Sequence, residues 1–255
     1  MEIQAHTEKP RPANLRSTGI LDSNHPEVLK LADSQSKRGM TDRAWLQAVH
    51  THLAKMLSPV YSLDEWQAAS TTLRKGRGSC SQRMACLEAV ARAKGIATRV
   101  QAFRVKGEFW FPRFHFAQWF IPKDVLLVWP HFFLDGAWLG FDELYSSMEE
   151  LAAHAAHGFM NNAESIFEAV QNVPIDFVGK TCGLACARPE HSLAKFVNAN
   201  EGTFDSRDEA LERFGSLQFT IRGRMFEFLY GDRKSRQANR ARQASASGWI
   251  ASAST

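Results

Sequence analysis

The chain has 255 residues and a net charge of +4, with 44% apolar and 23% charged residues. This composition excludes a disordered or coiled-coil protein, and the length allows one large domain, or one domain of roughly 100–200 residues with appendages. No apolar stretch is long enough to span a membrane, and no basic segment followed by an apolar one begins the chain. We therefore predict a cytoplasmic protein without membrane contact.

Four regions are predicted along the chain. A flexible arm rich in proline and charge spans 1–25, a core domain spans 26–145, and a helical C-terminal extension spans 146–230. A disordered basic tail spans 231–255, and its charges are typical of a solvated segment rather than of a phosphate-binding one. No nucleic-acid partner is therefore predicted.

The first half of the core domain has the pattern of helices. Apolar residues recur at helical spacing between His25 and Leu57 and predict two helices that break near Gly39. A loop through Pro59 follows, and another helical or irregular segment begins at Leu63. The next helix is predicted from Ser79 to Lys94 and ends at Gly95; its buried stripe consists of Cys80, Met84, Leu87 and Ala91.

The second half of the core has the pattern of an antiparallel β-meander. Runs rich in Val, Phe, Trp and Ile predict strands at 97–105, 114–121, 125–134 and 137–142. Asp135-Gly136 between two of these runs is typical of a two-residue hairpin turn.

The C-terminal region shows a weaker pattern. Residues 146–170 are predicted to be helical with a break near Gly158, residues 174–200 to be irregular, and residues 208–214 to form one more helix. An apolar run then ends at Tyr230.

Cys80 has the surroundings of a nucleophile. The four cysteines are too few and too unevenly spaced for a disulfide framework, so we expect reduced thiols. A thiolate at a helix N-terminus is stabilised by the helix dipole and by nearby N–H groups, and the backbone N–H of the cysteine can face an oxyanion. Gly76 and Gly78 let the chain turn sharply and approach a substrate closely. Cys86, deeper in the helix, is predicted to be a packed thiol.

Three segments carry a resemblance to a known family. The runs GRGSCSQ, RAKGIATRV and FLDGAWLGFDE resemble the transglutaminase-like superfamily, of bacterial type, over roughly residues 40–145. The resemblance implies an α+β, papain-like core in which the cysteine-bearing helix packs on an antiparallel meander. It also implies that Cys80 is the nucleophile and that Asp142 orients a histidine. Leu127 occupies the position at which the family has that histidine.

The nearest histidine on that strand is His131. If Asp135-Gly136 forms the turn, then residue 131 pairs with 140, and Leu127, His131 and Asp142 share one face of the sheet. We therefore predict a Cys80–His131–Asp142 site, with His131 as the base. The alternatives are a structural role for His131, His115 as the base, and Asp142 as a strand-end cap. Trp66 is either a core tryptophan or, as in some relatives, an indole donor to the oxyanion.

The predicted chemistry is cysteine-dependent acyl transfer or hydrolysis without a cofactor. The acyl donor would be an amide, ester or thioester of a peptide, a metabolite or a carrier protein, and the acceptor an amine or water. One rival is a non-catalytic protein that binds a peptide or acyl ligand, and another is a subunit of a complex. Both rivals would use the aromatic side chains of Phe109, Trp110, Phe111, Phe114 and Trp119.

A metal site is not predicted. Cys182 and Cys186, with His191 following, match a zinc knuckle poorly, because no second cysteine pair completes it. His154 and His157 are three residues apart on a predicted helix and could ligate a metal, but the polar face of the helix explains them equally well.

Overall fold

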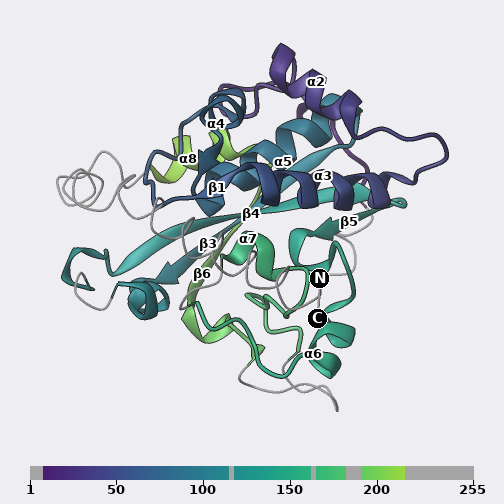
Figure 1. Cartoon of the computed structure of the whole chain (residues 1–255). Helices are drawn as coiled ribbons and strands as arrows, with labels where there is room; N and C mark the ends of the chain where they lie inside the picture. The colour runs from purple at the N-terminus through teal and green to yellow at the C-terminus, as the bar shows by residue number, and fades with distance from the viewer. Residues whose placement is uncertain (1–7, 115–117, 162–164, 182–190, 216–255) are drawn as a thin grey trace, which may run out of the picture.

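The computed structural model describes residues 8–114, 118–161, 165–181 and 191–215, and they form an α+β fold. The helices are α2 (Pro26–Ser34), α3 (Asp42–Met56), α4 (Ala69–Lys75), α5 (Cys80–Lys94), α6 (Met148–His154), α7 (Ile166–Ala169) and α8 (Arg207–Phe214). The main strands are β3 (Thr98–Lys106), β4 (Asp124–Leu134), β5 (Ala137–Gly140) and β6 (Val197–Phe204). They form an antiparallel sheet in the order β5-β4-β3-β6. Helices α2 to α5 lie together in the upper part of Figure 1, and α8 packs against β3, β4 and β6, so the predicted α+β class is confirmed.

Helix α5 is enclosed by its neighbours and packs against α2, α3 and α4. A capping box closes its first turn, because the side chains of Ser79 and Gln82 each accept a hydrogen bond from the other residue's backbone N–H. Gly95 ends the helix with φ 90°, a conformation that suits glycine. The sequence predicted one buried stripe, but the charged face is buried as well, because Glu88 forms an internal ion pair with Arg207 of α8.

The helices before α5 follow the sequence pattern. The predicted break near Gly39 is confirmed, since Gly39 lies between α2 and α3 with φ 78°. Two short parallel strands, β1 (Ser58–Pro59) and β2 (Arg77–Gly78), then pair on either side of α4. This pairing fixes the glycine-containing loop that leads into α5.

The predicted hairpin joins β4 to β5. His131 pairs with Gly140, and Phe133 pairs with Trp138. Asp135 and Gly136 both have positive φ, 54° and 83°, as a type I′ turn requires. The register derived from the Asp-Gly turn is therefore confirmed.

The strand predicted at 114–121 is wrong in the part that can be described. Two 3₁₀ helices, η2 (Gly107–Arg113) and η3 (Gln118–Phe120), connect β3 to β4 there, and residues 115–117 lie outside the described part. Pro112 lies within η2 and Pro122 follows η3, and the fixed φ of proline suits the tight turns that replace a strand there.

The C-terminal region is less helical than the sequence predicted. Within 174–200, predicted to be irregular, a 3₁₀ helix, η6 (Ala194–Phe196), leads into β6, which pairs with β3 and completes the sheet. Among the described residues of 146–170, α6 and the short α7 are the only helices, whereas the last predicted helix is present as α8. The apolar run ending at Tyr230 and the basic tail lie outside the described residues.

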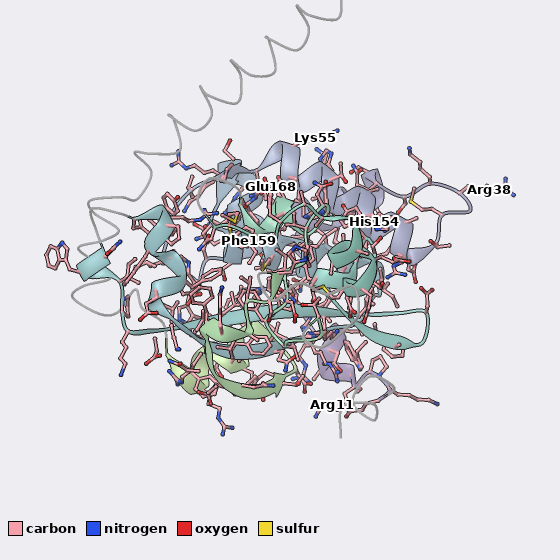
Figure 2. All side chains as sticks on the ribbon, turned by 90° about the horizontal axis from the view of Figure 1, so that it is seen from below. Arg11, Arg38, Lys55, His154, Phe159 and Glu168 are labelled. Atoms are coloured by element: carbon pink, nitrogen blue, oxygen red, sulfur yellow. The ribbon has the colours of Figure 1, made fainter. Side chains whose placement is uncertain are left out.

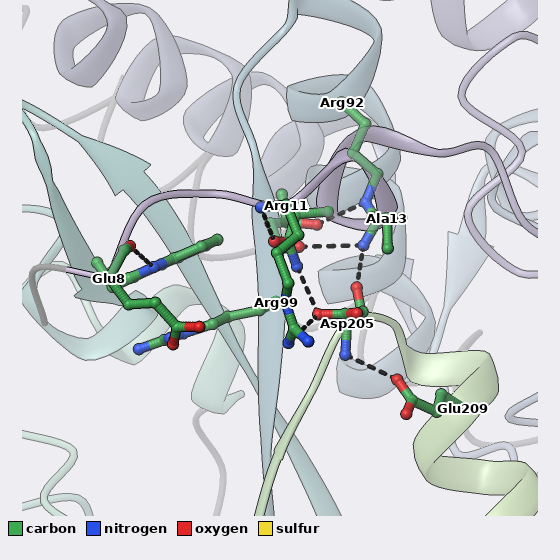
Figure 3. A network of polar contacts seen from close by, with 10 residues as sticks. Glu8, Arg11, Ala13, Arg92, Arg99, Asp205 and Glu209 are labelled. Carbon is green, nitrogen blue, oxygen red and sulfur yellow. Dashed lines mark hydrogen bonds and ion pairs between the residues drawn. The ribbon is translucent and has the colours of Figure 1, made fainter. Parts of the chain in front are cut away.

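Residues 8–25 pack against the core and do not form the loose arm that the sequence predicted. Arg11 forms an ion pair with Asp205, at the junction of β6 and α8. The Arg92 guanidinium of α5 donates to the carbonyl oxygens of Ala13 and Asp205, as Figure 3 shows. These bonds join the N-terminal segment to α5 and to the end of β6. They also satisfy the buried Arg92 guanidinium, which needs hydrogen-bond acceptors inside the protein.

None of the helices that can be described is both long and apolar enough to cross a bilayer.

Candidate functional site

Cys80 is the first residue of α5 and is half-buried. The loop before it is tightly packed, because a Cβ on Gly78 would lie 2.8 Å from the Thr72 side chain. Gly76 takes φ 62°, which glycine adopts readily. The thiol is therefore held at the helix end, where unpaired N–H groups and the positive end of the dipole stabilise negative charge.

Among the residues that the structure describes, the Cys80 sulfur has one hydrogen-bonding partner, the hydroxyl of Ser165, with 3.4 Å between Sγ and Oγ. Arg83, one turn further along α5, donates to the same hydroxyl oxygen over 3.2 Å. The Arg83 guanidinium is fully buried and also binds both carboxylate oxygens of Glu168. A chain of polar contacts thus runs from the thiol to α7.

Glu168 brings this chain of contacts to the surface. Its side chain lines an open groove of about 340 Å³, together with Lys55 of α3 (Figure 2). Thr51, Ala54, Leu57, Ser58 and Gln171 complete the lining of the groove.

His131 and Asp142 lie elsewhere. Both line a cavity of about 110 Å³ against the sheet, and Cys80 is not among the described residues that line it. The structure thus brings His131 and Asp142 together and places Cys80 outside their cavity. The remaining lining residues are Arg99, Gln101, Phe103, Trp129, Ile175, Phe177, Val178, Lys180 and Thr203.

The Asp142 carboxylate is buried at the end of the hairpin. The indole N–H of Trp129 donates to its Oδ1 over 2.7 Å. A Cβ on Gly140 would lie 2.3 Å from the same oxygen, so only glycine permits this approach. Burial raises the pKa of Asp142 from 3.8 to about 6. Asp142 can therefore hold a proton in mildly acidic solution.

Leu127, which was predicted to occupy the histidine position of the family, pairs with Phe103 of β3. Its side chain is half-buried and packs against the main hydrophobic core. An apolar side chain here cannot exchange a proton with Cys80.

The other sulfur and imidazole groups have different surroundings. Cys86 is fully buried, and burial raises the pKa of its thiol, as predicted for a packed cysteine. His154 and His157 each contact a backbone carbonyl oxygen. Within the described residues, no group of three His, Cys, Asp or Glu side chains could hold a metal ion. Cys182, Cys186 and His115 lie outside the described part of the chain.

The predicted aromatic surface is largely internal. Phe109 and Phe114 are buried, and Phe109 packs edge-on against Phe177. Trp119, in contrast, is 67% exposed. Trp66 packs against the core, and its indole N–H is buried without a hydrogen-bond partner among the described residues, which agrees with the interpretation of Trp66 as a core tryptophan.

The sequence did not predict three residues that lie near Cys80 or in the cavity of His131 and Asp142, namely Arg83, Ser165 and Lys180. Arg83 could have been found, because it lies three positions after Cys80 on one helix. Ser165 and Lys180 follow Cys80 by 85 and 100 residues, as their numbers show, and neither lies in a recognisable motif. Only the folded chain reveals their position.

Comparisons with known proteins gave one match. Residues 30–143 match the family model described as Transglutaminase-like superfamily. Searches of curated proteins and of solved structures gave no match. The matched range includes Cys80, His131 and Asp142, and it ends before Ser165 and β6.

Proposed function

Because residues 30–143 form a transglutaminase-like domain, we propose that the protein is a cysteine-dependent acyltransferase or hydrolase with Cys80 as its nucleophile. Proteins of this superfamily are generally cysteine enzymes of the papain-like type. The observation that carries the proposal is the position of Cys80 at the capped start of α5, behind a rigid glycine-containing loop. A thiolate there has the dipole support that cysteine nucleophiles use.

In the proposed reaction, the Cys80 thiolate attacks the carbonyl carbon of an amide, ester or thioester. A carbon–sulfur bond forms, and the tetrahedral oxyanion collapses with loss of the amine, alcohol or thiol, which takes up a proton. Water or an amine then attacks the thioester and releases Cys80. The backbone N–H of Cys80 is the proposed donor to the oxyanion.

His131 is the proposed base and Asp142 its orienting partner. Their shared cavity and the raised pKa of Asp142 support a functional pair. A working base must come within hydrogen-bond reach of the thiol or be linked to it by one water. The proposal therefore requires His131 and Cys80 to be joined by the substrate, by a water or by movement of β4.

The test is intact mass spectrometry of the full chain after incubation with short acyl thioesters and amides. The expected result is one acyl adduct, which peptide mapping assigns to Cys80 and which Cys80→Ala abolishes. Cys86→Ala is the matched control, because Cys86 lies on the same helix but is fully buried, and this variant should keep the adduct. Absence of any adduct, or an adduct on Cys86, would overturn the proposal.

A second candidate is a transglutaminase-like protein that binds an acyl ligand or peptide without turnover. Leu127 favours it, because the histidine position of the family holds an apolar side chain. A protein of this kind would bind an acyl peptide in isothermal titration calorimetry but would form no adduct and no product.

A further inference from the structure

The hydroxyl of Ser165 is surrounded by hydrogen-bond donors. Its oxygen accepts from Arg83 Nη1 over 3.2 Å and from the backbone N–H of Phe167 over 3.3 Å. A guanidinium and a backbone N–H can only donate, so both bonds occupy lone pairs of the serine oxygen. The Ser165 proton is left to point elsewhere.

Among the residues that the structure describes, the remaining hydrogen-bonding neighbour of this hydroxyl is the Cys80 sulfur, 3.4 Å from Oγ. Because the two lone pairs of Ser165 are already used, the serine must donate and the sulfur must accept. A thiolate is a far better acceptor than a thiol, and hydrogen bonds to an ionised acceptor are about twice as strong as neutral ones. The geometry therefore suits a charged sulfur at Cys80.

The donors around Ser165 are held in place by the core. The Arg83 side chain is fully buried, is paired with Glu168, and lies 4.4 Å over the ring of Phe167. Ser165 itself is buried and caps the start of α7. Neither Arg83 nor Ser165 can turn away without breaking several of these contacts.

We propose that Ser165 and Arg83 are positioning residues that hold Cys80 as a hydrogen-bonded thiolate. The inference deepens the proposed function and rests on it only in that Cys80 is the nucleophile. It gives the C-terminal region a role at the site, because Ser165 and Glu168 lie outside the matched range 30–143. Arg83 stabilises the charge through the hydroxyl and does not touch the sulfur.

The experiment is iodoacetamide alkylation of the full chain from about pH 6 to pH 9, the range in which thiols ionise. Mass spectrometry follows the modification of Cys80 and needs no substrate. Ser165→Ala should slow alkylation near neutral pH by about tenfold and move the rate profile to higher pH. Ser165→Thr, which keeps the hydroxyl, should restore the parent profile.

Two further variants separate this effect from a loss of structure. Ser147→Ala removes the equivalent capping serine of α6 and should leave the profile unchanged. Glu168→Gln removes the charge that pairs with Arg83, at a partly exposed position. It should shift the pH profile of Cys80 alkylation less than Ser165→Ala does.

The outcomes distinguish this inference from the proposed function. If folded Ser165→Ala is alkylated as fast as the parent or faster, with the same pH profile, the positioning role is wrong, even if acyl adducts form. If Ser165→Ala shifts the pH profile of Cys80 alkylation but the parent never forms an acyl adduct, the positioning role of Ser165 is supported and the acyl-transfer proposal is wrong. Should Ser165→Ala fail to fold, an unchanged profile in Glu168→Gln would overturn the inference.

Discussion

The start of α5 and the cavity at β4 hold their polar groups in different ways. At the helix start, Cys80 contacts the hydroxyl of Ser165, which accepts hydrogen bonds from Arg83 and from the backbone N–H of Phe167, and we propose that this arrangement favours a thiolate. In the cavity, Asp142 is buried with one indole donor, and its pKa is raised, so negative charge is disfavoured. The two regions thus surround their ionisable groups differently, with a polar hydroxyl beside Cys80 and burial around Asp142. Catalysis requires the two regions to be connected.

The largest expected effect comes from breaking that connection. If His131 is the base, His131→Ala should reduce the rate of Cys80 acylation by about 10³-fold or more, because loss of one member disables the whole unit. Stopped-flow measurement of thioester consumption gives this rate.

The control for this variant is His154→Ala, which removes an exposed imidazole on α6 (Figure 2) and should not change the rate. Equal rates for His131→Ala and the parent would show that the two regions are independent. The second candidate function would then be favoured if the parent also showed no turnover.

The next effect is on stability and concerns the cavity alone. The pKa of Asp142 is raised from 3.8 to about 6 in the folded protein, so its contribution to stability is complete below about pH 4 and is lost as the pH rises through 6. The loss is about 3 kcal/mol for two pKa units. Asp142→Asn keeps an oxygen for the indole N–H of Trp129 but does not titrate. Relative to the parent, its free energy of unfolding in urea should therefore rise by about this amount between pH 4 and pH 7.

The stability of Asp142→Asn must be compared with that of the parent at each pH, because His50 also makes stability depend on pH. Burial lowers the pKa of His50 from 6.5 to about 4, so its contribution is complete above pH 6.5 and is lost as the pH falls through 4. The effects of His50 and Asp142 oppose each other in the parent. A difference between Asp142→Asn and parent that stays constant with pH would contradict the prediction.

The smallest effect concerns the helix start. Ser79→Ala removes the capping box of α5 and Ser147→Ala that of α6, and each should lower the free energy of unfolding by about 1 kcal/mol. Only Ser79→Ala should also slow alkylation of Cys80, because the cap orients the N–H groups beside the thiol. Equal rates of Cys80 alkylation in Ser79→Ala and Ser147→Ala would show that the capping box of α5 does not affect the reactivity of Cys80.

Local signals explain what the sequence could predict. The cysteine helix has a capping serine, a helical apolar spacing and a terminal Gly95, and the hairpin has Asp135-Gly136 between two apolar runs. Each signal acts within a few residues, so α5 and β4 appear where they were expected, whereas β5 ends at Gly140 and the predicted strand residues Phe141 and Asp142 lie in a 3₁₀ helix.

Strand β6 shows why other elements were missed. Its sequence, VNANEGTF, is rich in polar residues and glycine, and seven of its eight residues remain at least partly exposed. This strand is formed by backbone pairing with β3, which includes register shifts, and it has no buried apolar face that a sequence pattern could reveal. The run after Lys106 was wrong in the opposite direction, because its aromatic residues suggested a strand, whereas the chain forms the 3₁₀ helices η2 and η3 there.

The site was predictable only in its separate parts. The motif around Cys80 and the hairpin geometry identified the thiol and placed His131 beside Asp142. The contact of Ser165 with Cys80 depends on how residues 165–169 pack against α5, which no local pattern encodes. The base in the proposed mechanism stays a prediction.

The pairing of β3 with β6 also bears on how the chain is made. Phe103 pairs with Asn200, so β3 leaves the ribosome about a hundred residues before its partner. Until then one edge of β3 presents open N–H and C=O groups, and closing so long a loop is slow. Translation that stops after the matched domain would yield a chain with an uncovered edge that can pair with other chains. Nascent chains of this protein are therefore exposed to aggregation until residue 204 has been synthesised.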